Sequence, residues 1–250
     1  MKINGKISAL LTIVLLLAPP AISRAQDDTS DTAASDSDQT ATTADSDTNA
    51  SPTLKELMAE TDEVTNTVGI VLEKILPTLW VGEYEVTQDA YQKVMGSNPS
   101  AFQGGDHPVD SVTWNDAMAF CKRLTAQEQK ANELPKGYIY TLPTEAQWDR
   151  LVDDASLDDA VMSLNMHRRT STAPVGSLGA NGLGLYDMRG NVMEWCLDSH
   201  DPTHYRVLRG GAWDTYIEIN ARIGFREYSA PDKTKNDYGF RVVLEPKGSE

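Results

Sequence analysis

Apolar residues between Thr53 and Leu76 recur with the three- and four-residue spacing of an amphipathic helix. Pro77 ends this pattern, because proline cannot continue a helix. A β-branched cluster at 64–68 opposes the helix, since such side chains lose rotamer freedom there. We predict an N-terminal helix over residues 53–77, which either packs on its own domain or presents its apolar face to a partner. The apolar positions are Leu54, Leu57, Met58, Val64, Val68, Val71, Leu72, Ile75 and Leu76.

Residues 79–151 combine short alternating runs with helices that have recognisable starts. Leu79 to Val86 and Tyr138 to Leu142 alternate as strands do. Thr87, Thr113 and Thr144 each stand where a helix should begin, because a threonine hydroxyl can accept from a free backbone N–H of the first turn. The supporting residues are Asp89 in the first helix, Asp116 in the second, and Gln147, which completes a capping box in the third.

The remaining sequence alternates short apolar runs with glycine-rich stretches, which predicts irregular strands joined by loops. Because helices come early and strands late, this order favours an α+β fold over alternating β/α units. The expected strands are Ala173 to Val175, Tyr205 to Leu208, Ala221 to Arg226 and Phe240 to Leu244.

The first residues have the three parts of a secretory signal peptide. Lys2 and Lys6 precede an uncharged apolar run over 7–17, and Ser23 and Ala25 are the small residues that a signal peptidase requires. The apolar run is too short to span a bilayer comfortably. We predict a signal peptide over residues 1–25, cleavage after Ala25, a secreted or periplasmic protein, and no membrane insertion after cleavage.

Residues 26–52 differ in composition from everything that follows. They hold seven Asp and eleven Ser or Thr, with no Lys, Arg or aromatic residue. Such a segment buries too little apolar surface to offset its ordering entropy, so we expect a disordered acidic tether. The whole chain has a formal net charge of −15. An acidic chain disfavours binding to nucleic acid or to an anionic membrane surface.

Two cysteines, Cys121 and Cys196, occur in this exported chain. Oxidising surroundings permit a disulfide between them, although two isolated cysteines do not form a disulfide scaffold. The pattern favours two small buried apolar residues, with mutual pairing as the alternative.

Six short blocks then occur in order along residues 79–244. They are VGEYEVT at 81–87, PVDSVTW at 108–114, LPTEAQW at 142–148, GLYDMRGNVMEW at 184–195, LRGGAW at 208–213 and YGFR at 238–241. In this combination the chain resembles the sulfatase-modifying-factor family, whose founding member is the formylglycine-generating enzyme. The resemblance places the domain at residues 78–246. It implies a C-type-lectin-like fold of the formylglycine-generating-enzyme variant, irregular and loop-rich, with short antiparallel strands.

The resemblance fails at the family's catalytic position. In the family's enzymes two cysteines shortly after the RGGS block bind copper, because soft thiolates hold Cu(I), and oxidise a substrate cysteine to formylglycine. This chain has no cysteine after Cys196, its stretch from Trp213 to Arg222 has no soft ligand pair, and Ala212 replaces the serine. We therefore predict no copper, no catalytic residues and no formylglycine formation.

The resemblance also implies a structural calcium ion in the loop at 184–195. The residues at the family's ligand positions are Asp187 and Glu194, through their carboxylates, and Gly190 and Val192, through their carbonyls. Calcium takes hard oxygen donors in flexible geometry. The alternative is a metal-free loop in which the two carboxylates bind backbone amides.

Two further groups of residues are weaker candidates. His200 and His204 are separated by Pro202, which breaks the helix that would align them, so we expect a loop without metal. Arg222, Arg226 and Arg241 could form an anion-binding cluster, but pairing with the chain's many carboxylates is favoured. These groups do not alter the expected function.

The sequence thus predicts an exported, non-catalytic family member that binds or scaffolds in the cell envelope, with an unidentified protein or glycan as partner. The alternative is an oxidase-type enzyme of the same family with non-copper chemistry. Such an enzyme would need a facial set of His and carboxylate ligands, and the chain has four histidines. The choice between the two hypotheses rests on analogy with the fold, which does not by itself assign function.

Overall fold

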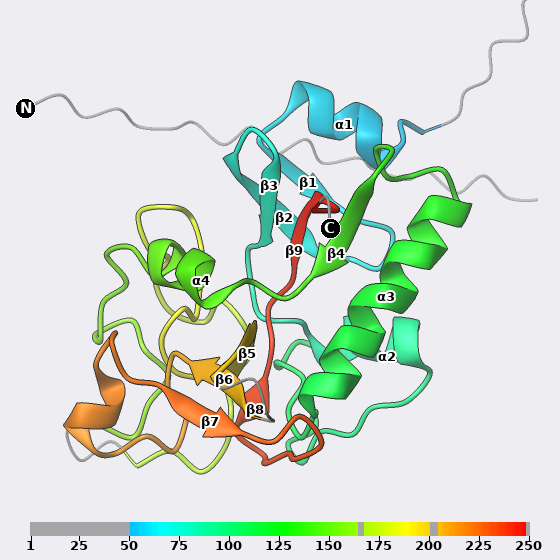
Figure 1. The fold of residues 1–250 in the computed structure, drawn as a ribbon. Helices are drawn as coiled ribbons and strands as arrows, with labels where there is room; N and C mark the ends of the chain where they lie inside the picture. The colour runs from blue at the N-terminus through cyan, green and yellow to red at the C-terminus, as the bar shows by residue number, and fades with distance from the viewer. Residues whose placement is uncertain (1–50, 165–167, 201–204, 249–250) are drawn as a thin grey trace, which may run out of the picture. The chain divides into compact units, whose positions relative to one another are not determined.

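The computed structural model describes residues 51–164, 168–200 and 205–248. The predicted signal peptide, and the tether up to residue 50, lie outside the described residues. Two sheets and four α-helices form the fold (Figure 1). The helices are α1 (Leu54–Glu60), α2 (Gln88–Met95), α3 (Trp114–Lys130) and α4 (Glu145–Leu151), and a 3₁₀ helix, η1, spans Glu218–Ala221.

The larger sheet has the strand order β1-β2-β3-β9-β4 and the smaller sheet has the order β7-β6-β5-β8. All neighbouring strands are antiparallel except β5 and β8. The strands are β1 (Glu63–Thr65), β2 (Val71–Leu76), β3 (Leu79–Gly82), β4 (Tyr138–Thr141), β5 (Met193–Ser199), β6 (Arg206–Arg209), β7 (Glu227–Ser229), β8 (Tyr238–Gly239) and β9 (Val243–Pro246).

The predicted helix over 53–77 is wrong beyond its first two turns. Helix α1 ends at Glu60, and a hairpin of β1 and β2 follows, with Val64 opposite Leu72. The buried Asn66 makes the turn, because its Oδ1 accepts from the amides of Val68 and Ile70. Since β2 also pairs with β3, the folded domain begins before residue 78.

The three threonine-started helices are confirmed. Thr87, Thr113 and Thr144 each accept from a first-turn amide, and the last two complete capping boxes. The strands predicted at 173–175 and 221–226 are absent from those residues; the second gives way to the end of η1 and an exposed turn before β7.

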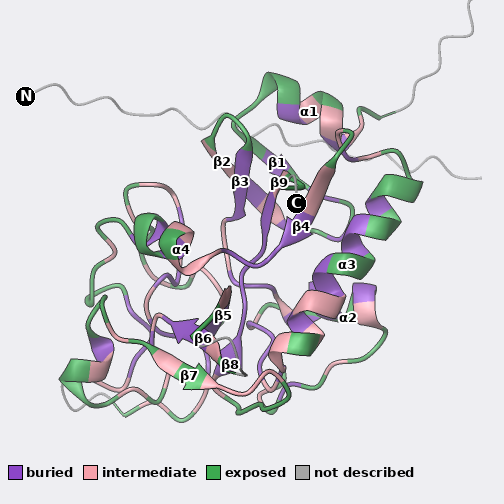
Figure 2. Ribbon diagram, in the orientation of Figure 1, coloured by how far each residue is buried: buried purple, intermediate pink, exposed green. Residues whose placement is uncertain are grey.

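Buried residues lie along both sheets and on parts of the helices (Figure 2), where apolar side chains form two large clusters. On one side α1, α2 and α3 pack on both sheets through a cluster that includes Phe120, Tyr140 and Trp195. On the other side α4 covers β3, β6 and β9 with Trp148 and Leu151. None of the helices in the described ranges is long and apolar enough to cross a membrane. Leu185 and Met188 of the stretch 184–195 pack in the same cluster as Trp148 and Leu151 of α4, so the polar groups of this stretch must find partners within the protein.

Candidate functional site

The loop Gly184–Trp195 adopts backbone angles that few residues tolerate. Asp187 and Asn191 have φ of 54° and 56°, and Gly190 has φ of 91°. A Cβ at Gly190 would lie 2.6 Å from the carbonyl oxygen of Val161, so only glycine fits there. Asn and Asp are the side-chain-bearing residues most often found in this left-handed region. The Gly, Asn and Asp content of this block therefore follows from the left-handed backbone angles of these residues.

Glu85 and Asn191 fasten this loop to the chain that follows β3. Glu85 is 2 % exposed, and its two carboxylate oxygens accept from the Val192 amide (3.0 Å) and the Asn191 Nδ2 (2.8 Å). Asn191 also accepts from the amide of Ala173 and donates to its carbonyl. One side chain thus joins three segments that are distant in sequence.

Arg241 and Glu194 form a buried ion pair at the centre of the same region. The Arg241 Nη2 lies 2.8 Å from the Glu194 Oε1, and both side chains are essentially inaccessible. The guanidinium also donates to the carbonyls of Gly82, Glu83 and Tyr186. The Trp148 Nε1 donates to the other Glu194 oxygen at 2.9 Å. Four of the six sequence blocks therefore meet in one network, defined here as the polar core: Glu85, Trp148, Asn191, Glu194 and Arg241.

The polar core and the adjoining Asp187 together place three carboxyl groups near one guanidinium. Burial raises the pKa of Glu85 well above its usual value, and the neighbouring Asp187 and Glu194 raise it further. Burial also raises the pKa of Asp187, although the amide of Gly176 opposes that shift. Ionisation of Glu85 and of Asp187 is thus less favourable here than in water.

The predicted calcium ligands lie in this region, but their oxygens are largely engaged. Glu194 accepts from Arg241 and Trp148, and the Asp187 Oδ2 accepts from the Gly176 amide at 2.7 Å. Six to eight oxygens are usual around calcium. Within the described residues, no hydrogen bond engages the second Asp187 oxygen or the carbonyls of Gly190 and Val192, and these three donors are fewer than calcium needs. This donor set does not fit a calcium ion by itself, and calcium binding by the loop stays a prediction.

Both cysteines are buried in the core and are not paired with each other. Cys121 is a buried residue of α3. Cys196 lies in β5, and its carbonyl accepts from the Nε1 of the Trp114 indole. Burial raises the pKa of both thiols. The alternative of a disulfide is wrong, and neither sulfur is a thiolate that could serve at the surface.

The RGG block begins the stretch where the family's enzymes carry their cysteines. Arg209 is fully buried and pairs with Glu145 and Asp149 of α4. The Cζ of its guanidinium lies 4.6 Å from the centroid of the Trp148 ring. Arg209 also donates to the Ile223 carbonyl at 2.8 Å. Ala212 is buried, and its amide donates to the Thr215 hydroxyl at 2.9 Å. The chain then turns outward.

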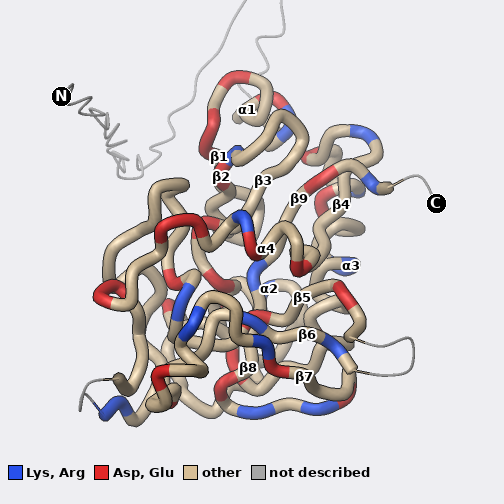
Figure 3. Tube along the Cα trace, turned by 60° about the vertical axis from the view of Figure 1, so that its left-hand side comes forward, with Lys and Arg blue, Asp and Glu red and all other residues tan. Residues whose placement is uncertain are grey.

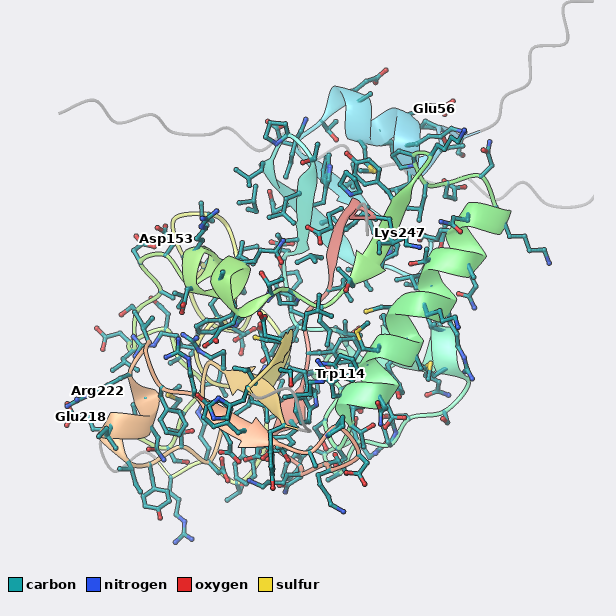
Figure 4. The ribbon with its side chains drawn as sticks, in the orientation of Figure 1. Glu56, Trp114, Asp153, Glu218, Arg222 and Lys247 are labelled. Carbon is teal, nitrogen blue, oxygen red and sulfur yellow. The ribbon has the colours of Figure 1, made fainter. Side chains whose placement is uncertain are left out.

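The segment Tyr216–Ile223, which includes η1, presents apolar side chains to solvent. The exposed fractions are 74 % for Tyr216, 44 % for Ile217, 56 % for Ile219 and 40 % for Ile223. Figure 4 shows Glu218 and Arg222 of this segment pointing outward beside one another. The sequence analysis considered residues 216–220 only for their lack of sulfur, although their run of Tyr and Ile was a signal of exposed apolar surface.

Arg222, Arg226 and Arg241 do not form an anion-binding cluster. Arg241 pairs with Glu194 and Arg226 pairs with Glu145, as the favoured prediction of carboxylate pairing expected. Arg222 is exposed on η1. Three arginines in one stretch of sequence thus have three different environments.

The described histidines have ordinary partners. His107 shares a 2.9 Å hydrogen bond with the Thr172 hydroxyl, and His200 packs on Tyr228 with ring centroids 3.8 Å apart. His167 and His204 lie outside the described residues. Within the described ranges, no group of three or more His, Cys, Asp or Glu side chains is placed to hold a metal ion.

Comparison with known proteins gives consistent matches. The family model for the sulfatase-modifying factor enzyme 1-like domain matches residues 59–246. The chaperone protein LppX of Paenibacillus barcinonensis is 31% identical over 226 residues, which cover 67% of this chain and 80% of LppX. The solved structure of Treponema denticola variable protein 1 is 27% identical, with a TM-score of 0.56, and the match covers 74% of this chain and 92% of that one.

Two further relatives differ from each other in activity by name. The formylglycine-generating enzyme of Streptomyces coelicolor is 32% identical over 168 residues, or 55% of this chain and 52% of the enzyme. The inactive C-alpha-formylglycine-generating enzyme 2 of Mus musculus is 31% identical over 157 residues, or 54% and 48%. The chain spans about half the length of these two relatives. Together with the family match and the C-type-lectin-like architecture, these findings show that the chain belongs to the sulfatase-modifying-factor family.

Proposed function

We propose that this protein is an exported, non-catalytic member of its family that binds another protein in the cell envelope. The observation that carries this proposal is the contrast between the two cysteines and the Trp213–Arg222 stretch. Both sulfurs are buried as neutral thiols, and the stretch where the family's enzymes hold copper has no cysteine and presents Tyr216 and Ile219 instead. The stretch that corresponds to the catalytic position of the family's enzymes therefore has, in this chain, the composition of a binding surface.

Two relatives support a binding role. One is named a chaperone protein and another an inactive enzyme. The second relative shows by its name that this fold exists without the activity, at an identity similar to that of an active enzyme. Since fold does not determine function, the proposal rests on the residues of this chain.

The proposal includes export, which the sequence of residues 1–25 supports. Fractionation of the producing cell should place the chain outside the cytoplasm, and N-terminal sequencing should begin at Gln26. An intact N-terminus on a cytoplasmic chain would contradict export without affecting the binding role.

The binding role is tested with the chain purified after export. It is added to a chemically denatured client protein, and light scattering follows aggregation on dilution. We expect the chain to suppress aggregation at near-stoichiometric amounts, whereas an equal mass of serum albumin suppresses it less.

The non-catalytic claim is tested separately. A cysteine peptide is incubated with the chain and Cu(I), with the S. coelicolor enzyme as positive control. Formylglycine formation, or stoichiometric iron or copper in the purified chain, would contradict the non-catalytic proposal.

A further inference from the structure

The segment Tyr216–Ile223 is held beside a second loop, which connects α4 to residue 160. Arg189 joins the two, since its guanidinium donates to the carbonyl of Ala155 at 3.2 Å and to the carbonyl of Ala221. Ala221 also packs with Ala160 and Met162 in a small buried cluster. The loop at 153–159 therefore borders η1, and its Leu157 is 39 % exposed.

This neighbouring loop has the sequence DDASLDD. Asp153, Asp154, Asp158 and Asp159 are all exposed. The carboxylates of Asp154 and Asp159 accept from the amides of Gly182 and Gly179. Along the described part of the chain none of the four forms an ion pair. Figure 3 shows Asp and Glu gathered beside α4.

The apolar segment itself carries no net charge. Glu218 and Arg222 have opposite signs. The adjoining loop carries −4, and Arg150 at the end of α4, together with Arg189 between the loop and η1, reduces this to −2. The surface thus consists of an apolar centre, formed by Tyr216, Ile217, Ile219 and Ile223, and an acidic rim, formed by residues 153–159. Exposed apolar patches with a polar border mark interaction sites.

We propose that this surface binds a polypeptide segment in which large apolar side chains stand next to Lys or Arg. The inference rests on the proposed binding function and names the class of partner. Apolar side chains of the partner would cover the Tyr216–Ile223 centre, and its cations would lie against the acidic rim. An apolar segment with acidic neighbours is repelled by the same rim, so charge decides which segments bind.

The test uses three fluorescent peptides of equal length and the exported chain. One peptide has an apolar run between lysines, the second has the same run between glutamates, and the third has lysines around a serine run. Fluorescence anisotropy should give a dissociation constant at least ten-fold lower for the first peptide than for either of the others. Raising the salt concentration should weaken binding of the first peptide, because its ionic contacts are exposed.

Surface variants identify the site. The double change Tyr216→Ser and Ile219→Ser should weaken binding of the lysine-flanked peptide at least ten-fold, and Asp153→Asn with Asp158→Asn should weaken it several-fold. Leu76→Ser is the matched control for the apolar change, since Leu76 is 50 % exposed at the end of β2. Glu60→Gln is the control for the lost charges. Circular dichroism checks that each variant is folded.

The possible results separate this inference from the proposed function. Equal binding of lysine- and glutamate-flanked peptides, or full binding by the Tyr216→Ser/Ile219→Ser variant, overturns the inference. Binding of a neutral oligosaccharide that the same variant abolishes overturns it as well. If the chain prevents client aggregation but binds no peptide, the inference fails and the binding function stands. If it does neither, the binding function fails.

Discussion

The polar core and the Tyr216–Ile223 segment are connected through the RGG block, but their chemistry differs. In the polar core every charged side chain is buried, and Arg241 alone makes contacts with four other residues. In the segment the side chains are exposed apart from the buried Ala221 and the half-buried Asn220, and Arg209 and Arg189 bind backbone carbonyls. The comparison teaches that the family blocks record the construction of a scaffold. In this chain that scaffold displays the Tyr216–Ile223 segment.

The largest expected effect comes from removing the cation of the polar core. Arg241→Met leaves Glu194 buried without a counter-charge, which costs about 3–5 kcal/mol. Urea unfolding should show this loss, or the variant should not fold. Arg222→Met removes an exposed arginine from the other region and should change stability by less than about 0.5 kcal/mol. An equal loss in the free energy of unfolding for Arg241→Met and Arg222→Met would contradict the difference between the polar core and the Tyr216–Ile223 segment.

Asn191 should give the next largest effect. Asn191→Ala leaves the Ala173 amide and a Glu85 oxygen without their partner, and it places alanine at a φ of 56°. These costs add to about 3 kcal/mol in the free energy of unfolding. Asn220→Ala in η1 is the matched control, with a change near zero. A loss below about 1 kcal/mol for Asn191→Ala would show that the loop does not depend on this side chain.

Asp237, which precedes β8 and lies outside the polar core, should make the stability of the folded chain depend on pH. Burial, followed by the charge of Asp214, raises the pKa of Asp237 to about 6. The folded chain therefore holds this proton more tightly than the unfolded chain. The stability it contributes is present below about pH 4 and is lost as the pH rises through 6. Between pH 4 and pH 7 the wild type should lose about 2 kcal/mol relative to Asp237→Asn.

Denaturant titrations at several pH values measure that difference. Asp232→Asn, an exposed change five positions earlier, is the control for removal of a carboxylate. Parallel pH profiles for the wild type and Asp237→Asn would contradict the assignment to Asp237.

Calcium should have the smallest effect on the folded domain. Because Arg241 already meets the charge of Glu194, saturating calcium should raise the Tm by no more than about 3 °C, or about 1 kcal/mol. Scanning calorimetry with calcium and with a chelator measures this. A calcium-dependent rise above about 10 °C would mean that the loop rearranges to supply further oxygens, which would sharpen the contrast between the two regions.

Local chemistry made the helix starts predictable. Thr113 and Asp116 satisfy each other's backbone within one turn, so four residues of sequence contain the whole arrangement. The spacing of Val64, Val68 and Leu72 did not contain enough information, because a helix and a hairpin both bury these residues. The choice depends on Asn66 and on pairing with β3, which lies further along the chain.

The candidate site was predictable as a set of blocks but not as a network. Glu194 was predicted to be a calcium ligand, and Arg241 was expected to pair with some carboxylate, but the sequence did not show that the two pair with each other. Glu85 was not singled out, since one glutamate in a strand-like run resembles an exposed residue. Its burial depends on the loop at 184–195 folding over it, and no local pattern encodes that contact.

The segment Tyr216–Ile223 is attached to the scaffold mainly through carbonyl oxygens, those of Ala221 and Ile223, which accept from Arg189 and Arg209. Every amino acid supplies a carbonyl. The attachment therefore survives a change of side chain at Tyr216, Ile217, Ile219 or Ile223, and selection for a new partner can alter these positions without rebuilding the domain beneath them.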